Sequence, residues 1–211
     1  MKSYVFVKGT LDLIFALILL LLVSPIMISA AIAIKLDSPG PALFRQKRPG
    51  KNGKLFSVFK FRTMRMETKK DGRHLSDIER MTKVGFFLRK TSVDELPQLF
   101  NILRGEMSFI GPRPLLVQYL EYYTTEQMRR HEVMPGISGW AQVNGRNAIR
   151  WEEKFKLDVW YVDHISFWLD VKIFFMTVWN VLNRKGINNS QSNTMPFFKS
   201  SVVEHLESSK F

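Results

Sequence analysis

The chain has no cysteine among its 211 residues, which excludes disulfides, cysteine-ligated zinc and thiol nucleophiles together. Its four histidines show no metal-ligand spacing. No Gly-x-Gly-x-x-Gly or Walker-type Gly-Lys-Ser motif is present, which argues against a Rossmann or P-loop nucleotide site. Acidic residues are also few, since 19 Asp and Glu face 31 Lys and Arg. The net charge of +12 attracts polyanions, namely nucleic acid, anionic lipid head groups or phosphorylated substrates.

Charge is missing altogether from residues 13–34. A helix of that length is roughly 33 Å long, close to the hydrocarbon thickness of a bilayer. Three structures fit such a segment. It can be a signal peptide with a small-residue cleavage site at residues 31–33, a helix that spans the membrane, or a helix that enters, kinks and returns to the same face.

Ser24 and Pro25, in the middle of this segment, favour the re-entrant helix. Pro25 cannot donate a hydrogen bond to the Leu21 carbonyl, and the Ser24 hydroxyl can help to satisfy the backbone groups that this frees. The apolar run continues past Pro25, which weakens the signal-peptide interpretation. Both flanks are basic, and the positive-inside rule then places both in the cytoplasm, which a single pass cannot do. The basic residues are Lys2 and Lys8 before the segment, and Lys35, Arg45, Lys47, Arg48, Lys51 and Lys54 after it.

The rest of the chain predicts a mostly helical domain with one β-hairpin. Residues 166–182 are helical and unusually apolar, so they predict either a central core helix or a helix in the membrane interface. The other expected segments are a break at 37–41, strands at 42–48 and 54–64 joined by 49–53, a polar loop at 68–77, helices at 78–90 and 96–103, helical runs at 115–123 and 126–131, and a structured loop at 135–147.

Asp94 and Glu95 form the sharpest local signal. Ser92 and Glu95 have the spacing of a capping box, and in a second register Asp94 itself is the N-cap. The first register puts both carboxylates in the first helical turn, and in either register the backbone N–H groups and the helix dipole stabilise their ionised form. An ionised Asp can act as a nucleophile, and two adjacent carboxylates can hold Mg²⁺. For an isolated Asp-Glu pair, plain helix capping is the competing interpretation.

Two further motifs carry candidate phosphate-binding residues. Prolines 112 and 114 fix the backbone around Arg113, whose guanidinium suits bidentate binding of a phosphate; a rigid turn with a solvated Arg is the alternative. Residues 135–147 are rich in glycine, and there Gln142 and Asn144 can form hydrogen bonds while Arg146 can meet a phosphate. An ordered loop without a binding role is the alternative for this second motif.

Taken together, these motifs resemble the bacterial sugar transferase family, the small monotopic polyprenyl-phosphate phosphoglycosyl transferases that start glycan assembly. The resemblance runs from about residue 8 to residue 186, and the chain is close in size to the minimal members. The ordered motifs are Ser24-Pro25, Arg48-Pro49-Gly50, Lys60-Phe61-Arg62-Thr63-Met64, Asp94-Glu95-Leu96-Pro97-Gln98, Gly111-Pro112-Arg113-Pro114 and Gly139-Trp140-Ala141-Gln142-Val143-Asn144-Gly145-Arg146-Asn147.

The resemblance implies an α/β fold, mostly α with a short β-hairpin. It implies a re-entrant membrane anchor at residues 1–36, kinked at Ser24 and Pro25, and a compact catalytic domain with interfacial helices at residues 37–186. The polar tail at 187–211 receives no role. The protein is expected to be monotopic on the cytoplasmic face of the bacterial inner membrane, with membrane lipids as partners. A second copy of the chain is also a candidate partner, whereas nucleic acid is not expected.

The resemblance also implies the reaction. Asp94 attacks the β-phosphate of a UDP-sugar, releases UMP and forms a phospho-sugar aspartyl intermediate, which polyprenyl phosphate then attacks. The implied cofactor is Mg²⁺, with Asp94 and Glu95 as its ligands, and Glu95 assists through the metal or as a base. The candidate phosphate- and nucleotide-binding residues are Arg113, Arg146, Lys60, Arg89, Pro112, Gln142 and Asn144.

One position departs from the family pattern. A basic residue is expected before Pro135-Gly136, and this chain has Met134 there. Arg130 or another nearby base is a candidate to replace it, and a different choice of substrate is the alternative.

Two rival functions remain at this stage. A membrane-tethered nucleic-acid-binding protein could use Phe56, Phe59 and Phe61, interleaved with basic residues, as a stacking platform. That function leaves the paired carboxylates at Asp94 and Glu95 without a purpose. A secreted structural protein is the other rival, and it predicts cleavage after Ala33.

Overall fold

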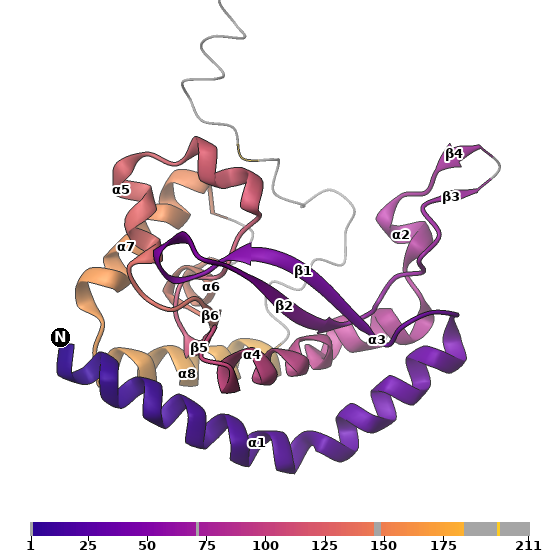
Figure 1. Cartoon of the computed structure of the whole chain (residues 1–211), viewed down its shortest axis with the longest axis horizontal. Coiled ribbons are helices and arrows are strands. Elements are labelled where there is room, and N and C mark those ends of the chain that lie inside the picture. The colour runs from indigo at the N-terminus through magenta and orange to yellow at the C-terminus, as the bar shows by residue number, and fades with distance from the viewer. Residues whose placement is uncertain (1, 71, 146–148, 184–197, 199–211) are drawn as a thin grey trace, which may run out of the picture. The chain divides into compact units, whose positions relative to one another are not determined.

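The computed structural model describes residues 2–70, 72–145, 149–183 and 198. These residues are mostly helical, with short two-stranded sheets (Figure 1). The elements are α1 (Lys2–Asp37), β1 (Leu43–Pro49), η1 (Lys51–Gly53), β2 (Leu55–Phe61), β3 (Lys69–Lys70), β4 (Arg73–His74), α2 (Asp77–Arg80), α3 (Lys83–Thr91), η2 (Val93–Gln98), α4 (Leu99–Leu103), β5 (Ser108–Ile110), η3 (Val117–Tyr122), α5 (Thr125–Met128), η4 (Arg129–His131), β6 (Gly136–Ser138), α6 (Trp140–Asn144), α7 (Trp151–His164) and α8 (Phe167–Leu182), where η marks a 3-10 helix.

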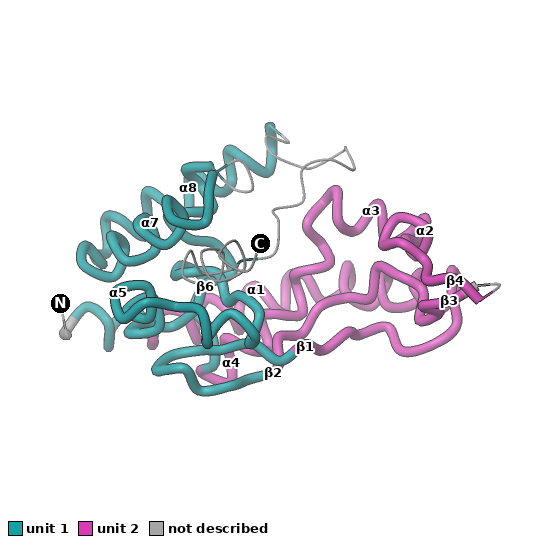
Figure 2. The backbone as a smooth tube through the Cα atoms, turned by 90° about the horizontal axis from the view of Figure 1, so that it is seen from above, with its two compact units in different colours: residues 1–8, 47–56, 106–211 teal, residues 9–46, 57–105 magenta. Residues whose placement is uncertain are grey.

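The chain divides into two compact units, coloured separately in Figure 2. Unit 1 comprises residues 1–8, 47–56 and 106–211, and unit 2 comprises residues 9–46 and 57–105. The predicted mixture of many helices with short strands is confirmed, as is the apolar N-terminal helix.

Helix α1 runs without interruption from Lys2 to Asp37, with Pro25 in its interior, and is bent near its middle (Figure 1). The Ser24 hydroxyl donates a 2.8 Å hydrogen bond to the Leu21 carbonyl. This is the carbonyl that Pro25 leaves without an amide donor, so the predicted compensation is present. Within the described ranges, α1 is the one helix long and apolar enough to cross a membrane, judged by length and composition.

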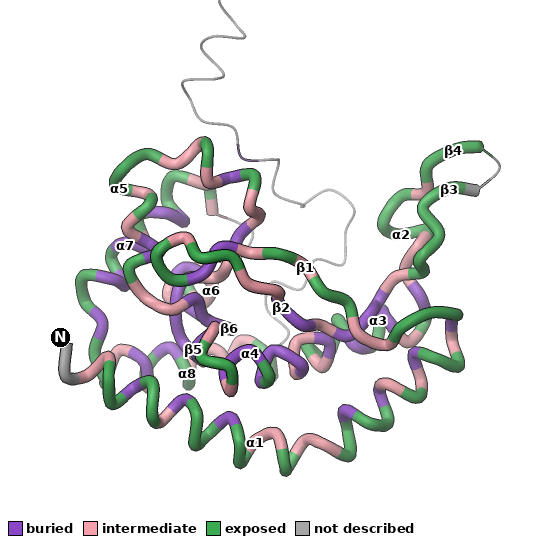
Figure 3. Tube along the Cα trace, viewed as in Figure 1, coloured by how far each residue is buried: buried purple, intermediate pink, exposed green. Residues whose placement is uncertain are grey.

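Unit 2 is built around the C-terminal half of α1. Met27, Ala30 and Ile34 are buried against Phe61 of β2 and Leu88 of α3. Much of the remaining surface of α1 is exposed, as the green segments of Figure 3 show. The buried stripe makes α1 part of the core, which argues against its removal as a signal peptide.

Close contacts fix the start of α3 and the segment that follows α1. The carboxylate of Asp37, the last residue of α1, accepts the Val84 amide of α3 at 2.9 Å. A Cβ on Gly85 would lie 1.9 Å from the Thr63 carbonyl, so only glycine lets α3 approach the chain after β2 this closely. Arg62 donates to three carbonyls in the segment after α1, those of Pro41, Pro39 and Ser38, at 2.7, 2.7 and 2.8 Å.

Unit 1 contains a parallel pair of three-residue strands, β5 and β6, in which Ser108 pairs with Gly136 and Ile110 with Ser138. A Cβ on Gly136 would lie 2.1 Å from the Gly111 amide nitrogen, so glycine is required for this approach. Helix α8 is joined to β6 by a 2.6 Å hydrogen bond between the hydroxyls of Ser138 and Thr177.

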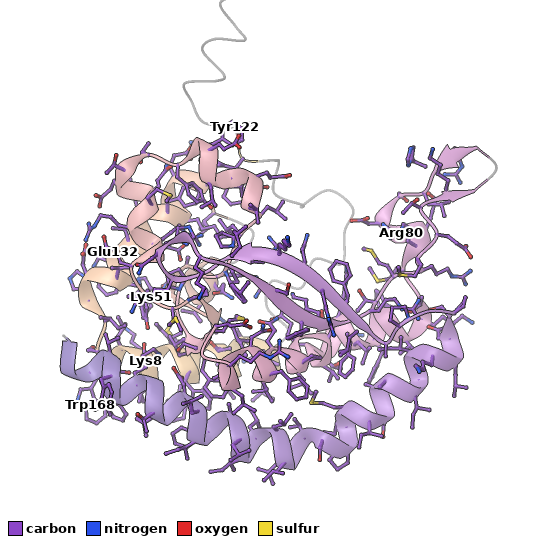
Figure 4. The ribbon with its side chains drawn as sticks, viewed as in Figure 1. Lys8, Lys51, Arg80, Tyr122, Glu132 and Trp168 are labelled. Atoms are coloured by element: carbon purple, nitrogen blue, oxygen red, sulfur yellow. The ribbon has the colours of Figure 1, made fainter. Side chains whose placement is uncertain are left out.

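The first turns of α1 belong to unit 1 and are held by α8. Lys8, labelled in Figure 4, forms a buried 2.6 Å ion pair with Asp170. Tyr4 donates to the same carboxylate at 2.6 Å, and Tyr161 of α7 donates to it at 2.7 Å. These three donors come from α1 and α7, so they satisfy the buried carboxylate and tie three helices together.

Several predicted elements need correction. The single helix expected at 78–90 is two helices, because the Thr82 hydroxyl accepts the Gly85 amide at 2.9 Å and caps a new start. The loop expected at 68–77 contains the β3–β4 hairpin, and the loop expected at 135–147 contains β6 and α6. The hairpin at 42–64 and the helix at 166–182 are confirmed as β1–β2 and α8.

Candidate active site

Asp94 and Glu95 lie in the first turn of η2, directly after α3. Asp94 is 9% exposed, so its carboxylate sits in a largely buried position. The predicted first-turn placement and the N-cap position of Ser92 are confirmed, but the predicted capping box does not form and Asp94 is not the N-cap. Ser92 occupies the N-cap in a left-handed conformation (φ 58°) and makes no side-chain capping bond, and Asp94 lies inside the helix. Ser92 therefore turns the chain between α3 and η2, and its side chain does not cap η2.

Lys60 of β2 forms an ion pair with Glu95. Its Nζ lies 2.6 Å from Glu95 Oε1, and the two side chains are 28% and 20% exposed. Two adjacent carboxylates repel each other, and a lysine at this distance offsets that repulsion. The partial exposure leaves both groups accessible to a ligand.

Asn101, which the sequence analysis did not single out, holds this arrangement together. The residue is fully buried in α4, where its Oδ1 accepts the Phe59 amide at 3.0 Å and its Nδ2 donates to the Ser57 carbonyl at 2.7 Å. These bonds fasten the helix that follows Glu95 to the strand that carries Lys60. An amide inside the apolar run 99–103 is the sequence signal that marks such a residue.

Arg89 also belongs to unit 2, near the end of α3. Its Nε donates to the Thr63 hydroxyl at 3.0 Å, and the residue is exposed. Four predicted site residues thus come from one unit: Lys60, Arg89, Asp94 and Glu95.

Pro112, Arg113, Gln142 and Asn144 belong to unit 1. Arg113 Nη1 and Gln142 Nε2 donate to the same carbonyl, that of Ile137, at 3.4 and 2.9 Å. The Pro112 carbonyl accepts the Gly136 amide at 3.1 Å, which joins the two glycine-containing motifs of the sequence. The structure therefore brings Arg113 and Gln142 together.

Asn144 is not joined to this pair by its side-chain hydrogen bond. Asn144 is exposed, and its amide donates to the Trp140 carbonyl of its own helix at 2.8 Å. Arg146 lies outside the described residues, as does the tail at 187–211 apart from Phe198.

Arg130 does not replace the basic residue expected at Met134. It is 2% exposed, and its guanidinium donates to the buried Asp158 carboxylate at 3.2 Å from Nε and 2.7 Å from Nη2. Its Nη2 also donates to the Arg113 carbonyl at 2.8 Å. Burial and pairing give this arginine a structural task and remove it from the list of open cations.

The donor set at Asp94 and Glu95 fits Mg²⁺. This ion binds through one or two carboxylates and keeps other positions for water and substrate phosphates. Among the described residues, no group of three or more metal-ligating side chains occurs. The type of site expected at Asp94 and Glu95 is therefore an open one and not a closed protein cage. Because Glu95 already pairs with Lys60, a cation at Glu95 competes with that lysine.

The aromatic stacking platform that a nucleic-acid-binding function would require does not form. Phe59 and Phe61 are 5% and 4% exposed, and Phe61 belongs to the core of unit 2. The guanidinium groups of Arg45 and Arg104 cover the Phe59 ring at 5.1 and 4.8 Å. Bases cannot stack on rings that are already covered.

Comparison with known proteins assigns the chain to a family. The model of the family described as bacterial sugar transferase matches residues 3–184. The uncharacterized sugar transferase EpsL of Bacillus subtilis (strain 168) is 51% identical over 194 residues, which cover 92% of this chain and 96% of that protein.

Two longer relatives carry names that state an activity. The UDP-glucose:undecaprenyl-phosphate glucose-1-phosphate transferase of Escherichia coli (strain K12) is 45% identical over 181 residues, or 81% of this chain and 39% of that protein. The UDP-N-acetylgalactosamine-undecaprenyl-phosphate N-acetylgalactosaminephosphotransferase of Aeromonas hydrophila is 42% identical over 191 residues, or 87% and 45%. The chain spans less than half the length of these two relatives. With a family match over most of its length and these identities, the chain belongs to the bacterial sugar transferase family.

Proposed function

We propose that the chain transfers a sugar-1-phosphate from a UDP-sugar to undecaprenyl phosphate, or a similar polyprenyl phosphate, and releases UMP. The observation that carries this proposal is the buried Asp94, followed by Glu95 in its 2.6 Å ion pair with Lys60. Membership of the family and the named activities of the longer relatives support the same reaction class.

In the first step, a carboxylate oxygen of Asp94 attacks the β-phosphorus of the UDP-sugar. The bond between that phosphorus and the bridging oxygen breaks, and UMP leaves with the electron pair. The product is a mixed anhydride that carries the phospho-sugar on Asp94. In the second step, a phosphate oxygen of the lipid attacks the same phosphorus, the bond to Asp94 breaks, and the carboxylate is restored.

The positive side chains lower the electrostatic cost of bringing an anionic nucleophile to an anionic donor. Lys60 already offsets the charge of Glu95, and in this proposal it also binds the phosphates of the donor. Arg89, Arg113 and Arg146 are the proposed phosphate ligands, with Gln142 beside Arg113 at the Ile137 carbonyl. Bound to Asp94 and Glu95, Mg²⁺ would supply further charge neutralisation at the phosphates.

We also propose that α1 is a re-entrant anchor and that the protein is monotopic on the cytoplasmic face. The first turns of α1 are fixed to α8 through Lys8, and its last residue is fixed to α3 through Asp37. Both ends of the helix are therefore bound to the globular, strongly basic part of the chain, which the positive-inside rule keeps in the cytoplasm. The Ser24 bond to Leu21 supports a stable bend at the bilayer level.

Helix α8 supplies a second membrane contact in this proposal. Only Asp170 and Ile173 of this helix are buried, so the central core helix considered from the sequence is not what forms. Trp168, labelled in Figure 4, is 77% exposed, and Trp179 is 62% exposed. Exposed tryptophans on an apolar helix are typical of the membrane interface, where a lipid-borne phosphate also lies.

The test is UMP release by the purified protein in nanodiscs with undecaprenyl phosphate and Mg²⁺, across a panel of UDP-sugars. At least one donor should give turnover, and Asp94→Asn should reduce it by several orders of magnitude, because Asn keeps the size but is not an anionic nucleophile. The matched control is Asp77→Asn, since Asp77 is an exposed acid at the start of α2. Wild-type turnover in Asp94→Asn, or no UMP with any donor, contradicts the proposal.

A further inference from the structure

Helix α7 carries a lysine in a position where lysines are rarely found. Lys154 is 6% exposed, and its Nζ lies 5.2 Å from the centre of the Trp151 ring. Charged lysines are almost never this deeply buried unless they have a paired or functional role. The catalytic scheme above does not use Lys154.

Hydrogen bonds connect the helix that carries Lys154 to Arg113. One helical turn further along α7, Asp158 is bound by Arg130, and the same Arg130 Nη2 donates to the Arg113 carbonyl at 2.8 Å. The Arg130–Asp158 ion pair thus links the helix that carries Lys154 to the backbone of the proposed phosphate ligand.

Electrostatic effects show that these cations share one neighbourhood. The pKa of Lys154 is lowered to about 8, first by burial; the charge of Asp158 opposes this shift, and the charges of Arg113 and Arg130 add to it. The charge of Arg113 therefore acts on Lys154 of α7.

We propose that Lys154 acts with Arg113 as one phosphate-binding cluster for the nucleotide part of the donor. This inference rests on the proposed function and extends it to a residue that is not assigned there. A phosphate bound at Arg113 turns the mutual repulsion of the two cations into attraction toward a common anion. Arg130 and Asp158 are positioning residues in this cluster, because they hold the Arg113 backbone.

The cluster makes donor binding depend on pH. Lys154 is mostly charged at pH 7 and loses its proton as the pH rises through about 8. The groups that face it are Asp158 on its own helix, Arg130 of η4, and Arg113 after β5. Since Asp158 is held by Arg130 and arginines keep their protons, Lys154 is the group of this set that titrates in the range.

The experiment measures KM for the UDP-sugar and kcat between pH 6.5 and 9.5, in wild type, Lys154→Arg and Lys154→Met. Wild-type KM should rise by up to about tenfold per pH unit above pH 8, with little change in kcat, as expected for loss of uniform binding. Lys154→Arg should give a flat profile because its charge persists. Lys154→Met should show a KM raised by about tenfold or more at pH 7 and no further rise with pH.

A binding measurement separates this inference from the proposed function. Calorimetry of UMP binding at pH 8.5, in buffers of different ionisation enthalpy, should show proton uptake by wild type and none by Lys154→Arg. Lys156→Met is the matched control, because Lys156 is an exposed lysine on the same helix, and it should behave as wild type. Melting curves confirm that each variant is folded.

The outcomes are distinct. If wild type releases UMP but Lys154→Arg keeps the pH-dependent KM, or Lys154→Met keeps the wild-type KM at pH 7, the cluster is wrong and the proposed function stands. If wild type turns over no donor yet binds UMP with Lys154-dependent proton uptake, the cluster is supported and the proposed reaction fails.

Discussion

At the scale of single residues, the ion pair between Lys60 and Glu95 is the contact that organises the candidate active site. Lys60→Met leaves Glu95 and the neighbouring Asp94 without this countercharge, so donor phosphates meet a more negative site. We expect kcat/KM for the UDP-sugar to fall by about 10²-fold or more, with Lys60→Arg retaining part of the activity. Because the pair is partly exposed, the loss of stability should stay near or below about 1 kcal/mol.

Steady-state kinetics and thermal unfolding of the two variants check this expectation. A Lys60→Met enzyme with unchanged kcat/KM would show that the ion pair has no part in donor binding. A large drop in melting temperature together with the loss of activity would assign Lys60 a structural role instead.

His131 makes stability depend on pH at the acid end. Burial, followed by the charge of Arg130, lowers its pKa from 6.5 to about 4. The unfolded chain therefore binds the proton more tightly, and stability is lost as the pH falls from about 6.5 toward 4, by up to about 3 kcal/mol. His131→Gln, which can still donate toward the Gly50 carbonyl, should lose part of this acid sensitivity.

The measurement is the melting temperature of wild type and His131→Gln between pH 4.5 and 7.5. Parallel curves for the two proteins would mean that other groups cause the acid sensitivity.

At the scale of elements, α1 carries the prediction about topology. The chain has no cysteine, so single cysteines introduced near Lys2 and near Lys51 report position without background. Both should react with a membrane-impermeant reagent from the cytoplasmic side alone. Replacing Pro25 by Ala restores the amide donor for the Leu21 carbonyl, so the helix should straighten and its N-terminus should become partly accessible from the far side. Periplasmic labelling near Lys2 in the wild-type background would rule out a re-entrant helix.

The elements also show how far the sequence leads. The apolar segment, the β1–β2 hairpin and α8 have long, continuous patterns, and the sequence predicts them within a few residues. The parallel pairing of β5 with β6 leaves no such trace, because strands of three residues lie 25 residues apart and depend on glycines at 111 and 136. The break between α2 and α3 likewise depends on the Thr82 cap, which a helical pattern across 78–90 hides.

The candidate site divides in the same way. Asp94, Glu95 and Arg113 stand out because their motifs are local. Lys154 and the Arg130–Asp158 pair do not, because their roles arise only when separate segments pack and bury them. Distance along the chain, and not chemical type, decides which site residues the sequence can reveal.

At the scale of the whole molecule, a net charge of +12 suits the proposed binding to an anionic membrane surface and to two anionic substrates. Because exposed charges are screened by salt, membrane association through basic flanks should weaken between 50 and 500 mM salt while the apolar α1 keeps the protein bound. Activity that survives high salt in nanodiscs but shows a raised donor KM would fit this division between anchor and electrostatics. Release of the protein from membranes by salt alone would contradict the anchoring role of α1.

The most direct test of the proposed mechanism omits the lipid acceptor. Wild-type protein mixed with its UDP-sugar and Mg²⁺ should release at most about one UMP per enzyme in a burst, and mass spectrometry should locate a phospho-sugar adduct on the peptide that contains Asp94. Asp94→Asn should give neither. If UMP appears only after polyprenyl phosphate is added and no adduct forms on Asp94, the transfer is a direct in-line displacement, and the covalent mechanism proposed here is wrong.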